Sequence, residues 1–492
     1  MLIKGRRTSA ALVAVVAAAL LVTACGSRVS PEKARAMHQD LADLARGDAP
    51  AGDTVVPSGD QPVATGETGT TLDPDAPADG PATPGGIDPS DGDGVAPPTG
   101  TGVNAPTGAG RAGPCDGLKN QTGVTDKEIV LANASDLSGP VPGLFAAARD
   151  GVRAYIAYFN ATSKLCGRSL RLVEYDSRTD ATGDTVAYEK ACSEAFAVIG
   201  SVSILDSGGA STAQRCGIPD LRSVSLSNER VRCNVCYPMQ SSRTGYIGIG
   251  PYVQMRKENK AASENAAFLY LNTGGSPVLA QGYAQVAKAA GWKVKMIQGI
   301  DTADFNYGPY VQRMKGLGIK YVHFVSATPQ AIRLARAMRD AGFTPEIYQL
   351  SQTQYTREYT EGVGANGDGS LISLPHGMFN QPNAEMKLYL TWLQQVRPGA
   401  DPSSFGVFAW SAMRMFIENA SQLGGKLTRA SLLKEVRKER KWTANGMHLN
   451  MDVGGKTTYT CAYLTRLSGG TWRHAPKSQV CGRLIKTSFA DD

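Results

Sequence analysis

Short apolar runs alternate with longer amphipathic segments from about residue 128 onward. Runs of four to eight apolar residues are typical of buried strands, and apolar residues that recur every three or four positions are typical of helices. The runs predict strands at 128–133, 170–175, 196–200, 218–224, 267–271, 292–297, 321–325 and 346–350. The segments between them predict helices that include 144–160, 278–290, 308–317 and 330–342.

This alternation predicts the fold class. Continuous apolar strands separated by helices form parallel sheets with helices on both faces. The pattern restarts at 267, and the roughly 375 residues from Cys115 to Phe489 exceed what one hydrophobic core usually holds. We therefore expect an α/β protein with two doubly wound parallel-sheet lobes. Such sheets bind ligands at the carboxyl ends of their strands, so the expected site is an interlobe cleft that a hinge closes.

The first residues carry the pattern of an export signal. Lys4, Arg6 and Arg7 precede an apolar stretch at 10–22, which is too short to span a bilayer comfortably. The following residues, 21–26, read Leu-Val-Thr-Ala-Cys-Gly and resemble a bacterial lipobox. We expect a signal peptide at 1–24 and a lipid on Cys25, which would anchor the chain to the outer face of the cytoplasmic membrane. The alternative is an ordinary signal peptide that happens to contain a cysteine.

A low-complexity segment follows the predicted anchor. Residues 47–110 consist mainly of Gly, Pro, Ala, Thr and Asp and contain no Lys or Arg. Such a composition cannot bury enough apolar surface to fold, so we expect 25–113 to be a lipidated N-terminus and an acidic, disordered tether. The whole chain nevertheless carries a net charge of +7, so the remainder is basic. The basic positions are not interleaved with aromatic residues, so nucleic acid is not an expected partner.

The cysteines beyond Cys25 form an even set of eight. In an exported chain such a set favours disulfides, although sequence alone does not fix their connectivity. The pairings that the order along the chain suggests are Cys192 with Cys216, Cys461 with Cys481, Cys233 with Cys236, and Cys115 with Cys166. A zinc site would need a second Cys or His pair near Cys233 and Cys236, and the sequence contains none there. We expect neither a metal nor a cofactor.

The sequence lacks the motifs of common enzyme classes. It contains no nucleophile elbow, phosphate-binding loop or paired-carboxylate motif, so we expect no catalytic activity. His323 falls within a predicted strand, where a core histidine is expected, whereas His376 either faces the cleft or packs. Trp410 is expected to begin a helix and to pack. A basic helix at 427–441 is expected to have a solvated face, with a permease-docking surface as the alternative.

Several stretches resemble the type I periplasmic-binding-protein family, in its leucine/isoleucine/valine-binding branch. The stretches that carry this resemblance are Leu-Ser-Gly-Pro at 137–140, Arg-Asp-Gly-Val at 149–152, Leu-Val-Glu-Tyr-Asp at 172–176, Cys-Gly-Ile-Pro at 216–219 and Ala-Met-Arg-Asp-Ala-Gly-Phe at 337–343. The resemblance implies three crossings between lobes. Lobe one would comprise 114–245 and 376–450, and lobe two would comprise 246–375 and 451–492. It also implies a monomer that captures a small solute for the permease of an ABC importer.

The family's ligand loops can be carried over to this sequence by position. The candidate ligand-binding residues are Ser203, Asp206, Ser225, Leu226, Ser227, Ser276, Ala327, Ser351 and Gln352. Branched-chain receptors usually stack two tyrosines on the ligand, and the matching positions here are Ser276 and Ala327. They also place a glutamate against the ligand's ammonium, and the matching position here is close to Ser351.

Two explanations of these departures remain open. Either the solute is not a standard branched-chain amino acid, or Asp206 or Asp304 supplies the carboxylate from another loop. We favour a different polar solute, such as an amide, a short organic acid or a small peptide. The alternative functions are a sensor or cell-envelope-binding lipoprotein of the same fold that is not coupled to transport, and a structural lipoprotein with a closed cleft.

Overall fold

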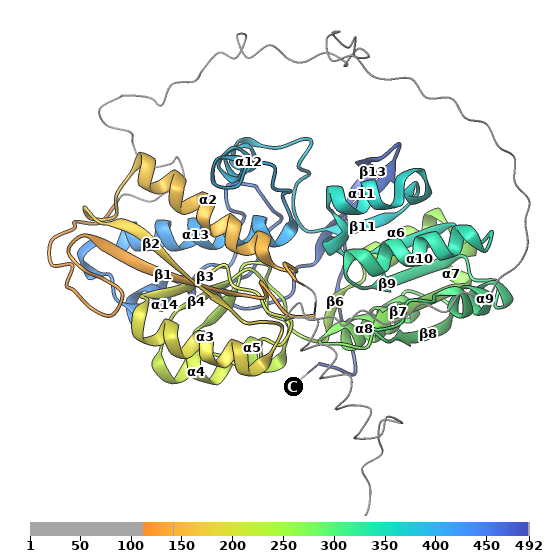
Figure 1. Cartoon of the computed structure of the whole chain (residues 1–492), viewed down its shortest axis with the longest axis horizontal. Coiled ribbons are helices and arrows are strands. Elements are labelled where there is room, and N and C mark those ends of the chain that lie inside the picture. Colours follow the sequence, from red (N-terminus) through yellow and green to blue (C-terminus); the bar gives the residue numbers. More distant parts are fainter. Residues whose placement is uncertain (1–111, 141, 491–492) are drawn as a thin grey trace, which may run out of the picture. The chain divides into compact units, whose positions relative to one another are not determined.

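The computed structural model describes residues 112–140 and 142–490, which all fall in one unit of the chain (Figure 1). The predicted signal peptide, the predicted lipidation site Cys25 and most of the predicted tether lie outside the described residues.

Lobe one, as we use the term, is the first sheet with its helices. Its five strands are all parallel, in the order β2-β1-β3-β4-β5. The strands are β1 (Glu128–Ser135), β2 (Ser169–Asp176), β3 (Ala197–Ile199), β4 (Asp220–Arg222) and β5 (Cys236–Pro238). The helices are α2 (Ala146–Thr162), α3 (Ala181–Glu194), α4 (Ala210–Cys216), α5 (Asn228–Arg232), α12 (Ala384–Val396), α13 (Ser404–Leu423) and α14 (Arg429–Val436), with the short η3 (Gly424–Lys426) after α13. Figure 1 shows α2 and α13 on one face of this sheet and α3 and α4 on the other.

Lobe two is the second sheet with its helices. Its seven strands have the order β13-β12-β11-β10-β9-β7-β8. Strand β12 pairs antiparallel with both β11 and β13, and the other neighbouring strands pair in parallel. The strands are β7 (Ala266–Leu271), β8 (Val294–Ile300), β9 (Tyr321–Val325), β10 (Ile347–Leu350), β11 (Leu371–Leu374), β12 (Cys461–Ser468) and β13 (Thr471–Cys481). The helices are α6 (Gly250–Glu258), α7 (Lys260–Glu264), α8 (Ser276–Ala289), α9 (Gly308–Gly316), α10 (Thr328–Asp340) and α11 (Arg357–Val363), with η1 (Gln352–Gln354) and η2 (Gly364–Gly367). A separate pair of strands consists of β6 (Tyr246–Gly248) and β14 (Leu484–Lys486).

Each face of the second sheet has its own apolar core. One core joins the sheet to α9, α10 and α11, and the other joins it to α6, α7 and α8. A sheet buried on both faces has strands that are apolar at nearly every position, which is why β9 (Tyr321–Val325) is buried throughout. The predicted fold class, with two doubly wound α/β lobes, is therefore confirmed.

Several predicted bounds need correction, among them the strand predicted at 218–224, which covers only Asp220–Arg222. The strand predicted at 292–297 is found at Val294–Ile300, because Trp292 packs into the core before the strand begins. The basic helix predicted at 427–441 is shorter, since α14 covers only Arg429–Val436. Trp410 packs as expected, although it lies within α13 and not at its start.

The hairpin of β12 and β13 was not predicted. Its strands pair in antiparallel register across Gly469 and Gly470, which both have positive φ angles of 55° and 70°. A Gly-Gly pair between two runs of alternating polarity is a hairpin signal, so the sequence contained the information.

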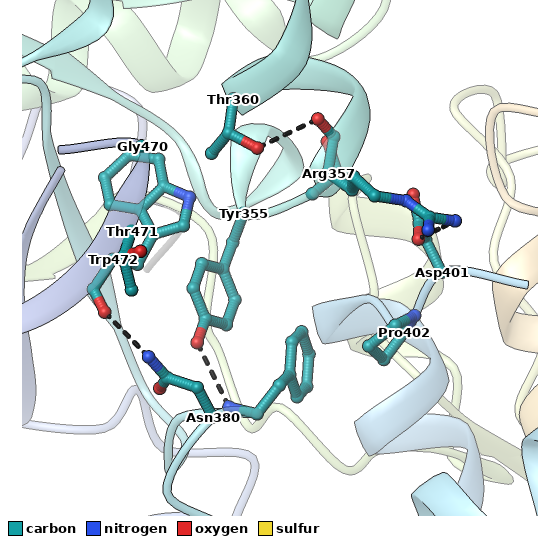
Figure 2. A pocket seen from close by; sticks show the side chains of 11 residues that line it. Tyr355, Arg357, Thr360, Asn380, Asp401, Pro402, Gly470, Thr471 and Trp472 are labelled. Atoms are coloured by element: carbon teal, nitrogen blue, oxygen red, sulfur yellow. Dashed lines mark hydrogen bonds and ion pairs between the residues drawn. The ribbon is translucent and has the colours of Figure 1, made fainter. Parts of the chain in front are cut away.

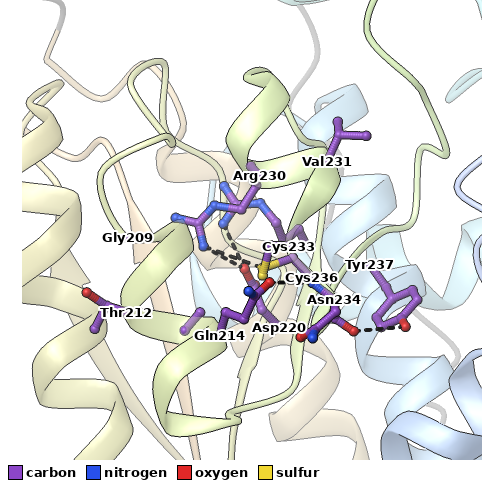
Figure 3. Close-up of a disulfide and its surroundings, with 12 residues drawn as sticks. Gly209, Thr212, Gln214, Asp220, Arg230, Val231, Cys233, Asn234, Cys236 and Tyr237 are labelled. Carbon is purple, nitrogen blue, oxygen red and sulfur yellow. Dashed lines mark hydrogen bonds and ion pairs between the residues drawn. A yellow bond between two sulfur atoms is a disulfide. The ribbon is translucent and has the colours of Figure 1, made fainter. Parts of the chain in front are cut away.

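All four suggested disulfides are present. They join Cys115 to Cys166, Cys192 to Cys216, Cys233 to Cys236, and Cys461 to Cys481. The Cys233–Cys236 disulfide connects the end of α5 to the start of β5 and lies beside the guanidinium of Arg230 (Figure 3), whose Nη1 is 3.8 Å from Cys236 Sγ.

That guanidinium belongs to a buried cluster of five charges in lobe one. Arg222 lies 3.4 Å from Asp206 and 3.0 Å from Asp220. Arg230 lies 2.6 Å from Asp184 and 3.0 Å from Asp220, and none of the five side chains is exposed. Burial disfavours the charged form of Asp184 and raises its pKa, which moves the cluster of three acids and two bases toward neutrality.

Truncation of one arginine should destabilise lobe one strongly. Arg230→Ala leaves the carboxyl groups of Asp184 and Asp220 without this partner, and breaking a buried pair costs about 3–5 kcal/mol. Urea unfolding at pH 7 measures the loss. The matched control is Arg171→Ala, which removes the partly exposed pair with Glu128 and should cost less than about 1 kcal/mol. Equal losses for the two variants would contradict this account of the cluster.

Two buried histidines lie where the chain passes between the lobes. The backbones of His376 and His448 form an antiparallel bridge. In His376, Nδ1 lies 2.7 Å from the carbonyl oxygen of Gly377 and Nε2 lies 2.7 Å from Ser404 Oγ. Since a carbonyl only accepts, Nδ1 carries the proton and Nε2 accepts from the serine hydroxyl. His376 is therefore a packed, hydrogen-bonded residue.

The second histidine repeats this arrangement. In His448, Nδ1 lies 2.8 Å from the carbonyl oxygen of Leu449, and Nε2 lies 2.9 Å from Ser411 Oγ. Burial lowers the pKa of His376 and of His448 to about 4 in each case. Both rings are therefore neutral in the folded protein at neutral pH.

Acidification should destabilise the fold through these rings. At pH values between the unfolded pKa of about 6.5 and the folded pKa of about 4, the ring is protonated in the unfolded chain but not in the folded protein. The free energy of unfolding therefore falls as the pH falls through this window. Each ring contributes a slope of up to about 1.4 kcal/mol per pH unit in this window. Urea unfolding at pH 6.5, 5.5 and 4.5 should therefore show a shallower pH dependence for His376→Gln than for the wild type. Parallel profiles would show that His376 does not carry this dependence.

Candidate functional site

The strand-end loops of lobe one are held by buried carboxylates. Asp136, after β1, accepts hydrogen bonds from Ser177 Oγ at 2.7 Å, Ser203 Oγ at 2.9 Å and the amide of Thr179 at 2.9 Å, while its other oxygen accepts from the amide of Ile204 at 2.8 Å. The predicted site residue Ser203 is therefore fully buried and bonded to its own lobe.

Asp176, at the end of β2, also holds a strand-end loop through hydrogen bonds. It accepts from the amides of Leu137 and Arg178 and from the amide and hydroxyl of Ser138. Partial burial would raise its pKa, but these hydrogen bonds outweigh it and the pKa is lowered. This carboxylate stays charged and secures the loop after β1.

Asp206 is also engaged within lobe one. Its two carboxylate oxygens accept from the amides of Leu226 and Ser227, at 2.9 and 3.0 Å, in addition to the ion pair with Arg222. Asp206 thus joins the loop after β3 to the loop after β4. Ser227 in turn caps α5 by accepting from the amide of Arg230. The structure therefore brings Asp206, Leu226 and Ser227 together, in contacts with one another.

The predicted residues of lobe two lie at the ends of β7, β9 and β10. Ser276 is the first residue of α8, and Ala327 precedes α10. Ser351 forms a capping box with Gln354 at the start of η1. Gln354 also donates to the carbonyl of Ser326 at 2.9 Å, which joins the loops after β9 and β10.

Three contacts connect these loops across the two lobes. Gln352 donates to the side-chain oxygen of Gln240 at 2.7 Å. Gly274 packs against Ile204. A Cβ added at this glycine would lie 2.5 Å from Ile204 Cγ1, which is too close for two carbon atoms. A Cβ on Gly275 would be 3.6 Å from the carbonyl oxygen of Leu226. The strand ends of the two lobes therefore face each other, as the predicted cleft requires.

Buried polar atoms without a partner lie at the same strand ends. Within the described part of the chain, Ser225 Oγ, Ser326 Oγ and Gln330 Oε1 are buried and make no hydrogen bond. Ser225 follows β4, Ser326 follows β9 and Gln330 is in the first turn of α10. Unpaired buried polar groups cost free energy, so each calls for an explanation such as a ligand. Ser225 was predicted from the sequence, whereas Ser326 and Gln330 were not.

Two helices of lobe two begin at this edge without a side-chain cap. Neither Gly275 at α8 nor Ala327 at α10 provides a side chain that accepts from the first helical amides. The amide groups at a helix N-terminus favour anions and hydrogen-bond acceptors. Lobe two therefore presents donors toward lobe one.

The carboxylates considered as partners for an ammonium are already engaged. Asp206 is bonded as described, and Asp304 Oδ2 accepts from Tyr310 Oη at 2.6 Å. Gln352, close to the position where the resembling family has an acid, is neutral. The arrangement suits a solute that presents acceptors and hydroxyl or amide groups to the protein better than one that presents a cation.

No cluster of three or more His, Cys, Asp or Glu side chains in 112–140 and 142–490 is arranged to hold a metal ion. None of the helices in those ranges is both long and apolar enough to cross a bilayer.

Comparisons with solved structures show the same fold at low identity. A leucine binding protein, LivK, from Thermotoga maritima has a TM-score of 0.60 and 16% identity, covering 72% of this chain and 98% of that one. A solute binding protein from R. palustris in complex with benzoate has a TM-score of 0.61 and 17% identity, covering 74% and 99%. A fatty acid ABC transporter substrate-binding protein from Thermomonospora curvata has a TM-score of 0.63 and 17% identity, covering 76% and 96%.

Sequence comparisons identify the family but no individual relative. No curated protein sequence matches the chain significantly. The family model described as periplasmic binding protein matches residues 128–471, which include nearly all strands of both lobes. The chain thus belongs to the periplasmic binding protein family, whose members are extracytoplasmic, non-enzymatic solute-binding proteins.

Proposed function

We propose that the protein is a lipid-anchored solute receptor that delivers a small polar solute to the permease of an ABC importer. Membership of the periplasmic binding protein family supports the receptor role. The lipobox-like residues around Cys25 support the anchor, and the tether at 25–113 would let the receptor stand clear of the membrane. The lobe boundaries implied by the family, at 245, 375 and 450, are part of the proposal.

The observation that carries the proposal is the set of unpaired buried atoms at facing strand ends. Ser225 Oγ belongs to lobe one, and Ser326 Oγ and Gln330 Oε1 belong to lobe two. The loops after β3 and β4 touch the loop after β7, which is the strand next to β9 in the sheet. A solute held between these loops would supply the missing hydrogen bonds from both lobes at once. Binding of this kind closes the hinge, because the closed form alone makes all the contacts.

The solute we propose carries a carboxylate, amide or hydroxyl group and no free ammonium. The uncapped N-termini of α8 and α10 favour an acceptor or an anion. The engaged carboxylates Asp206 and Asp304 leave an ammonium without a counter-charge. The similar structures include a leucine binding protein, a fatty acid transporter substrate-binding protein and a complex with benzoate, so receptors of this fold differ widely in their solutes.

A thermal-shift screen of the purified protein tests the proposal. The panel contains amino acids, primary amides, short organic acids and short peptides. A ligand at a hundred times its Kd stabilises the native state by about 2.7 kcal/mol, which is a clear rise in Tm. We expect hits among acids and amides and none among free amino acids. Hits restricted to α-amino acids would refute the solute class, and a panel without hits would favour a sensor or envelope-binding role.

A pair of serine variants separates ligand binding from structure. Ser225→Ala should abolish most of the ligand-induced shift and leave the unliganded Tm unchanged or slightly higher, because an unpaired buried hydroxyl is removed. Ser203→Ala is the matched control, since its hydroxyl donates to Asp136. That variant loses a buried hydrogen bond, so its free energy of unfolding should fall by about 1–3 kcal/mol and its unliganded Tm should fall with it. If Ser225→Ala retains the full ligand response, Ser225 does not contact the solute.

A further inference from the structure

A pocket of about 230 Å³ lies beside the passage between the lobes (Figure 2). It is lined by α11 and the residues before it, by the segment after β11, by the loop between α12 and α13, and by the β12–β13 hairpin. The lining includes Tyr355, Arg357, Phe379, Asp401, Pro402 and Trp472. None of the candidate solute-binding residues of the strand-end loops lines it. The pocket is smaller than the roughly 300–1,000 Å³ of sites for drug-sized ligands, so it suits a single ring.

Three aromatic side chains form the apolar wall. The rings of Tyr355 and Phe379 stack at 4.7 Å between centroids, and Trp472 meets Tyr355 edge-on at 5.9 Å. The hydroxyl of Tyr355 is already used, since it accepts from the amide of Phe379 at 3.1 Å. Aromatic walls of this kind favour a flat apolar ligand, through offset or edge-to-face contacts.

Trp472 also provides an unpaired donor. Its side chain is 6% exposed, and within the described residues its Nε1 has no hydrogen-bond partner. Figure 2 shows the nitrogen edge of this indole turned toward Tyr355. A buried indole N–H normally finds an acceptor, so the pocket lacks one at this point.

An exposed ion pair lies on the other side of the pocket. Arg357 Nη2 is 2.8 Å from Asp401 Oδ1 and 3.2 Å from the carbonyl oxygen of Gly399, and Arg357 Nε is 3.9 Å from Glu361 Oε1. Arg357 belongs to lobe two and Asp401 to lobe one, so this pair joins the lobes. Because Arg357 is 58% exposed, the pair contributes at most about 1 kcal/mol, and another carboxylate can compete for the guanidinium. Figure 2 shows Arg357 and Trp472 on opposite sides of Tyr355.

We infer that this pocket binds a single-ring aromatic carboxylate that has a second acceptor opposite the carboxylate. Its carboxylate pairs with Arg357, its ring packs on Tyr355 and Phe379, and its second acceptor receives the N–H of Trp472. The pocket contains none of the candidate solute-binding residues, although Tyr355 follows Gln354 in the loop after β10. Binding in this pocket does not depend on the solute proposed for the strand-end loops. Since Arg357 pairs with Asp401 across the lobes, occupancy of the pocket also changes a contact that holds the lobes together.

Isothermal titration calorimetry of the purified protein tests the assignment, with 4-hydroxybenzoate as the probe. Replacing the probe by 4-hydroxybenzamide should weaken binding about tenfold, because the charge-assisted bond to Arg357 is lost. Arg357→Gln should produce the same loss for the acid and little change for the amide. The matched control is Arg339→Gln, which alters another exposed Arg–Asp pair, with Asp340, outside the pocket. This control should bind the probe as the wild type does.

A second variant tests the donor. Trp472→Phe keeps an aromatic wall and removes the N–H, so it should weaken 4-hydroxybenzoate about fivefold and leave benzoate, which lacks the second acceptor, nearly unaffected. Preferential binding of 4-hydroxybenzylamine would overturn the charge assignment. Loss of probe binding in Ser225→Ala with full binding in Trp472→Phe would overturn the site, because the acid would then occupy the strand-end loops. No binding of the probe at millimolar concentration would also overturn it.

Discussion

The paired charges of Arg222 and Arg230 determine where the strand-end loops of lobe one lie. Each guanidinium contacts two carboxylates from different segments, which joins α3, the loop after β3, β4 and α5. An unpaired ion in this interior would cost several kcal/mol, so other arrangements of these segments are disfavoured. Since Asp206 also holds the amides of Leu226 and Ser227, the position of the neighbouring Ser225 follows from the same network.

The acids near the strand ends of lobe one serve the protein's own backbone. Asp136, Asp176 and Asp206 all accept from amides or hydroxyls of their own lobe. In the proposed function, recognition therefore falls to neutral groups, which individually contribute little but are costly when left unpaired. A site of this kind selects its solute by the match of donors and acceptors, because a solute that lacks one of them leaves a buried group without a partner.

The parts predicted from the sequence are those that depend on local pattern. Apolar runs located the strands, and the even cysteine count with chain order gave the disulfides. Positions carried over from the family include Ser225, whose hydroxyl is unpaired, and also Asp206, whose partners come from a different loop and are invisible in the sequence. Ser326 and Gln330 were missed because nothing marks a buried polar atom as unpaired until its neighbours are known. The aromatic pocket unites segments separated by more than one hundred residues, as the edge-to-face contact between Tyr355 and Trp472 illustrates.

The contacts between the lobes are weak enough for a solute to control them. The neutral hydrogen bond between Gln240 and Gln352 contributes about 0.5–1.5 kcal/mol, and the exposed pair of Arg357 with Asp401 about 0–1 kcal/mol. The glycines at 274 and 275 let the loops approach closely without adding strong bonds. Moving a two-state equilibrium from 1:99 to 99:1 takes about 5.5 kcal/mol of differential binding, which these contacts do not supply. In the proposed function, a solute that satisfies the buried groups of both lobes adds several hydrogen bonds in the closed form only, so closure would depend on the solute.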